Sequence, residues 1–143
     1  FLGGNIQLLA DGQILQLAAA PVTAVGSGNI QMQARGSDSG IQMNSEALIK
    51  AQTGQIRLLA DADIQLALLQ TGGSVTVQTS NGQIADNNDD AGVSRTNIIA
   101  DNLLLQAVSI GGPPTDFFNG LPQHLELSLT GKLSVEAREF AAL

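Results

Sequence analysis

Gly4-Asn5-Ile6-Gln7-Leu8-Leu9-Ala10 is a phrase that returns three more times along this chain. It recurs as GNIQMQA at residues 28–34, as GQIRLLA at 54–60 and, more loosely, as GSVTVQT at 73–79. The glycines that open the four copies, Gly4, Gly28, Gly54 and Gly73, follow one another at similar intervals. A period of about 20 to 50 residues is the sequence signature of a solenoid, in which similar units stack on one another. We therefore expect a stacked repeat architecture.

Each phrase alternates apolar and polar side chains, which is the pattern of a β-strand with one buried face. In the first copy, Ile6 and Leu8 are expected to point into the core and Gln7 outward. The expected core layers, which collect the equivalent positions of the four copies, are Ile6, Ile30, Ile56 and Val75, and Leu8, Met32, Leu58 and Val77. Small residues end each run, at Ala10, Ala34, Ala60 and Thr79. The chain is expected to bend there.

Two further apolar runs follow within each unit. The second run has an apolar–Gln–apolar pattern at 15–17, 41–43 and 64–66, and a fourth copy opens with Gln83-Ile84. The third run is weaker and lies at 22–25, 47–49, 68–69 and 97–99. Three short strands per unit, joined by small or polar corners, are typical of one coil of a parallel β-helix. Stacked coils also predict ladders of outward glutamine amides.

The predicted fold is therefore all-β: a right-handed parallel β-helix of about five coils with two loop excursions. We expect one domain over 1–143, a segment of a larger chain, with regular coils at 3–85, a loop at 86–96, a coil at 97–110, a Gly/Pro-rich loop at 111–122 and a coil at 123–137. The hand follows from the right-handed bias of parallel crossovers. A β-sandwich or another antiparallel form is the main alternative, because Asn81-Gly82 is a strong hairpin signal. A helical fold is a more remote one.

Composition excludes several functional classes. The net charge is −7 and the six basic residues are scattered, so nothing in the chain is suited to neutralising a run of phosphates, and no nucleic-acid partner is expected. There is no cysteine, hence no disulfide, no thiolate metal site and no thiol nucleophile. No stretch reaches the ~20 apolar residues that cross a bilayer, so membrane insertion by this segment is not expected.

The acidic loop Asp86-Asn87-Asn88-Asp89-Asp90 is the best candidate for a bound ion. Calcium prefers several hard oxygen ligands, which Asp and Asn side chains supply. The spacing matches neither an EF-hand nor the glycine-rich nonapeptide of calcium β-rolls. A solvated turn is the favoured interpretation, and we assign no cofactor and no metal residue beyond this weak calcium possibility.

No catalytic residue is assigned, and the chain is not expected to be an enzyme. Asp61 and Asp63 lie two positions apart at a corner, but acid–base cleavage needs a matched pair in a substrate groove. His124 is the only histidine and is expected to be a solvent-facing side chain at a strand end. Phe117 and Phe118 stand out in a chain with 3% aromatic residues. We expect them to cover the solenoid rather than to anchor a partner.

The repeat phrase, the apolar–Gln–apolar run and the stretch 73–86 resemble the filamentous-haemagglutinin-like and autotransporter-adhesin-like β-helix repeat proteins of bacterial surfaces. The stretch 102–112 is similar to the pattern that closes a repeat block in such chains. The resemblance covers residues 3–137 and implies an adhesive stalk segment that is secreted or exposed on the cell surface of a Gram-negative bacterium. It implies neighbouring repeats of the same polypeptide as partners, and host or matrix glycans or proteins as ligands. The alternatives are a carbohydrate-binding or polysaccharide-cleaving domain and a calcium-stabilised surface-layer module.

Overall fold

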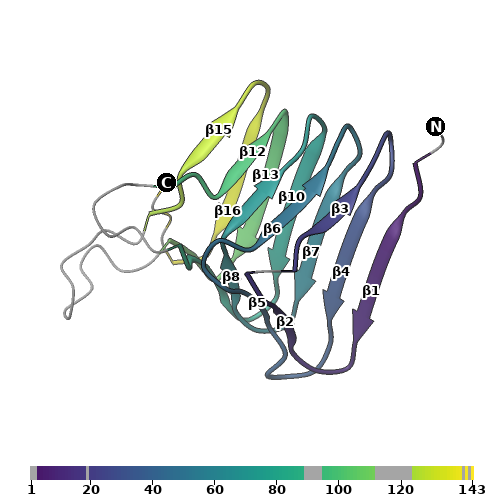
Figure 1. Ribbon diagram of the computed structural model, residues 1–143. Coiled ribbons are helices and arrows are strands. Elements are labelled where there is room, and N and C mark those ends of the chain that lie inside the picture. The colour runs from purple at the N-terminus through teal and green to yellow at the C-terminus, as the bar shows by residue number, and fades with distance from the viewer. Residues whose placement is uncertain (1–2, 19, 89–94, 112–123, 140, 142) are drawn as a thin grey trace.

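All the strands of the described structure belong to three parallel β-sheets. The computed structural model describes residues 3–18, 20–88, 95–111, 124–139, 141 and 143, and these contain sixteen strands and no helix. The first sheet has six strands, in the order β1 (Ile6–Ala10), β4 (Ile30–Ala34), β7 (Ile56–Ala60), β10 (Ser74–Thr79), β13 (Asn102–Ala107) and β16 (Leu133–Ala137). Figure 1 shows these strands as a row that runs from β1 at one end of the stack to β16 at the other.

The other two sheets have five strands each. The second sheet contains β2 (Ile14–Gln16), β5 (Ile41–Met43), β8 (Ile64–Leu66), β11 (Gln83–Asp86) and β14 (Ser109–Ile110). The third sheet contains β3 (Val22–Ala24), β6 (Leu48–Ala51), β9 (Leu68–Gln70), β12 (Ile98–Ala100) and β15 (Leu127–Leu129). The chain visits the three sheets in turn, so that each set of three strands makes one coil. The predicted parallel β-helix is confirmed, and the antiparallel alternative is wrong.

The layers predicted from the repeated phrase are confirmed in the first sheet. Ile6 pairs with Ile30, Ile30 with Ile56, and Ile56 with Val75. The same layer continues through Leu103 to Leu133. From the second to the fifth coil these side chains are at most 3% exposed. Burying one such aliphatic side chain contributes about 1.5–3 kcal/mol, so the stacked layers are the main source of stability.

The predicted alignment of the second run is wrong in the first coil. Ile14, not Leu15, pairs with Ile41, and Gln16 takes the place opposite Met43. Gln16 is consequently buried, while Leu15 is 56% exposed. The side-chain amide of Gln16 donates to the carbonyl oxygens of Ala20 and Leu48 at 2.9 and 2.8 Å. Its Oε1 is buried without a hydrogen-bond partner in the described structure.

A column of glycines lets successive coils approach closely. A Cβ placed on Gly28 would lie 2.4 Å from the carbonyl oxygen of Gly4, and one on Gly54 would lie 2.0 Å from that of Gly28. A Cβ placed on Gly73 would likewise lie 2.6 Å from the carbonyl oxygen of Gly54. Any side chain at these three positions would collide with the backbone of the preceding coil. Gly28, Gly54 and Gly73 are therefore each required by the coil that precedes them.

Candidate binding groove

A groove of about 390 Å³ crosses the ends of the strands of the first sheet from β4 to β16. Its base is formed by the small residues at which the strands end and the chain bends: Ala34, Ala60, Thr79 and Ala107. Its wall is formed by the outward side chains one residue earlier: Gln33, Leu59, Gln78, Gln106 and Glu136. The strand-end residues of four successive coils therefore lie along the groove.

The wall carries the amide ladder that the stacking predicted. Nε2 of Gln78 donates a hydrogen bond to Oε1 of Gln106. Nε2 of Gln106 in turn donates to Oε2 of Glu136 at 3.0 Å. Leu59 interrupts the row between Gln33 and Gln78, because it is aligned with both. The ladder therefore spans the last three coils and orients its amides along the groove.

Besides Glu136, two charged side chains line the groove, Asp61 and Arg138. Oδ2 of Asp61 accepts a hydrogen bond from the backbone N–H of Gly36 at 2.8 Å. Nη2 of Arg138 donates to the carbonyl oxygen of Ser80 at 3.0 Å. Together with the amides, they offer hydrogen-bond donors and acceptors to a polar ligand. The hydroxyl of Thr79 is already used, since it donates to the Ala62 carbonyl and accepts from the Gly82 N–H.

Asp61 and Asp63 do not form a carboxylate pair. Asp61 bonds backward to Gly36, whereas Oδ1 of Asp63 accepts from the backbone N–H of Gln83 in the following coil at 2.9 Å. Asp61 lines the groove described above, and Asp63 lines a separate hollow of about 210 Å³ beside the second sheet. Each carboxylate holds two neighbouring coils together.

Only the first half of the acidic loop is described. Oδ1 of Asp86 accepts from the N–H of Asn88 at 2.8 Å and from Nδ2 of Asn97 at 2.6 Å. Asn87 donates from Nδ2 to the carbonyl oxygen of Met43 at 2.7 Å. These contacts fasten the start of the loop to the solenoid. Asp89 and Asp90 lie outside the described residues, and the described ones contain no group of three acidic, histidine or cysteine side chains placed to hold a metal.

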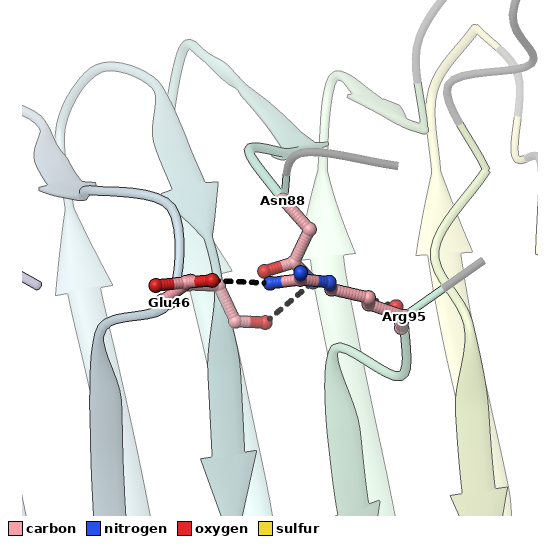
Figure 2. A network of polar contacts seen from close by, with 4 residues as sticks. Glu46, Asn88 and Arg95 are labelled. Atoms are coloured by element: carbon pink, nitrogen blue, oxygen red, sulfur yellow. Dashed lines mark hydrogen bonds and ion pairs between the residues drawn. The ribbon is translucent and has the colours of Figure 1, made fainter. Parts of the chain in front are cut away.

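The return of the same loop is fastened by an ion pair (Figure 2). Nη1 of Arg95 lies 2.9 Å from Oε1 of Glu46, in the turn between β5 and β6. Nδ2 of Asn88 donates to the Arg95 carbonyl at 3.4 Å. Glu46 has a φ of 67°, in the left-handed region that residues with a side chain seldom adopt. Asn87 and Arg95 of the fourth coil thus both reach past the third coil to the second.

Of the remaining candidates, His124 is half-buried rather than solvent-facing. Its Nδ1 is buried and has no hydrogen-bond partner in the described part of the chain. Phe117 and Phe118 lie outside the described residues.

Asn97 is the important polar residue that sequence reasoning missed. It is fully buried. Its Nδ2 donates to Asp86 and to the carbonyl oxygens of Leu66 and Ala67 at 3.3 and 3.2 Å, and its Oδ1 accepts from the Glu126 N–H at 2.9 Å. The residue therefore joins three successive coils. The available signal was an asparagine directly before an apolar run and shortly after a long polar excursion.

Comparison of this chain with protein-family models, with curated proteins and with solved structures gives no match. No helix in the described residues is long and apolar enough to cross a membrane. Function must therefore be inferred from the solenoid and from its groove.

Proposed function

We propose that the chain is a structural segment of an adhesive stalk, part of a large secreted or surface-exposed protein of a Gram-negative bacterium. The observation that carries this proposal is the unbroken in-register stack of the first sheet, in which one core layer runs from Ile6 to Leu133. A solenoid of this kind is a rod whose length grows with the number of coils. Five steps separate β1 from β16, which at the spacing of paired strands is about 24 Å of rod.

The resemblance of the repeat phrase to adhesin-like β-helix proteins supports the location and the partners. The partners are neighbouring repeats of the same polypeptide and host or matrix glycans or proteins. A low charged fraction of 13% and the absence of cysteine accord with this class of chain. We propose no catalytic role.

Bead retention under flow tests the adhesive role. Beads coated with the chain are passed over surfaces that carry individual matrix proteins, glycans or cultured host cells. The expected result is retention above that of albumin-coated beads, and competition by the free chain. Retention equal to that of albumin on every surface would refute the adhesive part of the proposal.

The groove favours a second candidate, the binding of a hydroxyl-rich polysaccharide. Amides and carboxylates that follow one another at the coil spacing suit a ligand with repeated hydroxyl groups. Cleavage is not supported, because Asp61 and Glu136 belong to coils three steps apart, or about 14 Å. Glycosidase carboxylates lie about 5–9.5 Å apart.

Calorimetric titration with neutral and acidic oligosaccharides tests this second candidate. Gln106→Ala is expected to weaken binding, because it removes the centre of the amide ladder. Gln31→Ala is the matched control, since Gln31 is an outward amide of β4 that does not line the groove. Equal affinities for the two variants would place any binding elsewhere.

A further inference from the structure

Asn81 and Gly82 form a chemically labile pair at the corner between β10 and β11. An asparagine that precedes a glycine loses its side-chain amide more readily than other asparagines, because glycine has no Cβ to shield its backbone nitrogen. Asn81 is exposed, so water reaches its side chain. Asn119-Gly120 is the other such pair in the sequence and lies outside the described residues. The reactivity of Asn81 therefore depends on how the fold holds Gly82.

The fold holds the nitrogen atom that would attack the Asn81 side chain. The backbone N–H of Gly82 donates to Oγ1 of Thr79 at 3.1 Å, and that hydroxyl donates to the carbonyl oxygen of Ala62 at 2.6 Å. Because the hydroxyl proton is committed to Ala62, Oγ1 acts toward Gly82 as an acceptor only. Thr79 is 5% exposed and Gly82 is buried, so water is kept from this contact. The nitrogen must lose its proton before it attacks, and the bond to Thr79 retains that proton.

The backbone on either side of this nitrogen is fixed as well. The N–H of Asn81 donates to the carbonyl oxygen of Asp61 at 3.0 Å, and the carbonyl oxygen of Gly82 accepts from the N–H of Val108 at 3.0 Å. A Cβ placed on Gly82 would lie 2.3 Å from the carbonyl carbon of Ala62, so the residue is closely packed. Attack on the Asn81 side chain requires the peptide group of Gly82 to rotate. Rotation would break these contacts.

We propose that Asn81 is a deamidation site that is protected in the folded stack and reacts when the corner between β10 and β11 opens, with Thr79 as the residue that protects it. In the open corner, the nitrogen of Gly82 loses its proton to water and forms a bond to Cγ of Asn81. The Cγ–Nδ2 bond breaks, and Nδ2 takes up a proton and leaves as ammonia. Water then hydrolyses either carbonyl of the resulting succinimide ring, which gives aspartate or isoaspartate without any oxidant or reductant.

Refolding would not reverse this modification. Isoaspartate adds a methylene to the main chain beside Gly82, whose backbone already lies against that of Ala62. Either product also adds a negative charge to a corner that is bonded to the corner of Asp61 and Asp63. A corner that has opened for long enough to react is therefore marked permanently and closes less well.

Mass spectrometry of the chain after incubation in a mildly alkaline buffer tests the proposal. Proteolytic fragments locate each residue at which an amide has become a carboxylate. In urea, Asn81 and Asn119 should convert at the same rate, because each precedes a glycine. In the folded chain, conversion of Asn81 should be at least tenfold slower than in urea, because only the open state reacts. Equal rates for Asn81 in the two conditions would overturn the proposal.

Thr71 provides a matched control for the role of Thr79. Its Oγ1 donates to the carbonyl oxygen of Gly54 at 2.6 Å and accepts from the N–H of Gly73 at 3.0 Å, which is the same pair of bonds that Thr79 makes. The two threonines are also equally buried, at 4% and 5% exposed. Thr71→Val and Thr79→Val should therefore lower the melting temperature by similar amounts. No asparagine precedes Gly73, so only Thr79→Val unlocks a reactive pair.

The rate at Asn81 in the folded variants decides the role of Thr79. Thr79→Val is expected to convert Asn81 about tenfold faster than Thr71→Val does, because it frees the N–H of Gly82. Thr79→Ser keeps the hydroxyl and should convert Asn81 as slowly as the unaltered chain. Equal rates in the two valine variants would overturn the proposal, because conversion would then follow global unfolding. Fast conversion in a folded Thr79→Ser variant would also overturn it.

Discussion

Replacing Gly54 with alanine is the sharpest test of the stacked-glycine column. The added Cβ would lie 2.0 Å from the carbonyl oxygen of Gly28, 2.6 Å from its carbonyl carbon and 3.0 Å from the carbonyl oxygen of Ser27. All three atoms are backbone, so no side chain can rotate away. The described glycines with left-handed φ are Gly26, Gly36 and Gly111, so the cost at Gly54 is one of space and not of backbone conformation.

The size of the effect follows from these distances. To relieve the collision with the added Cβ, β4 and β7 would have to separate by about 1 Å along a ladder of five paired positions. Overpacking a rigid site lowers the free energy of unfolding by about 1–3 kcal/mol. A collision with backbone atoms should cost an amount at the upper limit of this range, because no side chain can move aside. We therefore expect Gly54→Ala to lower the free energy of unfolding by about 3 kcal/mol. In a chain of this size this corresponds to a fall in melting temperature of roughly 6–12 °C.

Urea unfolding followed by far-UV circular dichroism, at concentrations where the chain is monomeric, measures this cost. Gly4→Ala is the matched control, because it makes the same chemical change at the same position of the repeat in open space. It should be neutral or stabilise by about 0.4–1 kcal/mol through the unfolded state. If both variants lose the same stability, the steric argument fails. If Gly54→Ala loses less than about 1 kcal/mol, the lower limit for overpacking, the coils are not held at the described distance.

Three further substitutions test other parts of the structure. Asn97→Ala should cost about 2–4 kcal/mol in urea unfolding, because it removes buried side-chain hydrogen bonds to backbone groups of the third and fifth coils. Ile14→Ala should cost about 2–4 kcal/mol, while Leu15→Ala should change stability by less than about 0.5 kcal/mol, because Ile14 faces the core and Leu15 faces solvent. A double-mutant cycle on Glu46 and Arg95 should give a coupling below about 1 kcal/mol that shrinks with added salt, since both side chains are largely exposed.

Each of these has a contrary outcome. A larger loss for Leu15→Ala than for Ile14→Ala would restore the alignment expected from the apolar–Gln–apolar pattern. A neutral Asn97→Ala would mean that the buried amide is dispensable. A coupling well above the range measured for exposed ion pairs would show that Glu46 and Arg95 are shielded from water.

The first sheet could be predicted residue by residue because its pattern has one solution. In Ile30–Ala34, Ile30 and Met32 are separated by Gln31, so the inward face is fixed. The spacing of the opening glycines then aligns each copy with the next. The prediction extended correctly to the third sheet, where Ile49, Leu69 and Ile98 form one layer.

The predicted alignment of the second strand of the first coil was wrong for a specific reason. Ile14-Leu15-Gln16-Leu17 offers two ways to bury two side chains, and the local pattern favours Leu15 with Leu17. The structure buries Ile14 with Gln16, and the corner from Ala10 to Ile14 then has the same length as the corner from Ala60 to Ile64. The corners from Ala34 to Ile41 and from Thr79 to Ile84 are longer, so the sequence alone left this alignment open.

The groove was missed because no single residue in it is unusual. It arises from small residues in one column and amides in the next, and only the register brings together Gln78, Gln106 and Glu136. The roles of Asp61 and Asp63 could not be predicted either, because the two side chains lie at one corner but bond to different coils. Asp61 accepts a hydrogen bond from the preceding coil, and Asp63 accepts one from the following coil.

The strand pairing also bears on how such a chain acquires its structure. In the first sheet, the ladder joins Val75 to Ile56 where the paired residues are closest in sequence, and Leu133 to Leu103 where they are farthest apart. A coil therefore needs only the coil before it as a template, and a single further repeat of new chain completes it. Folding can then proceed in one direction as the polypeptide is delivered, whether from a ribosome or through a pore. Each folded coil would oppose backward movement of the polypeptide, because its backbone groups and side chains are already paired with those of the coil before it.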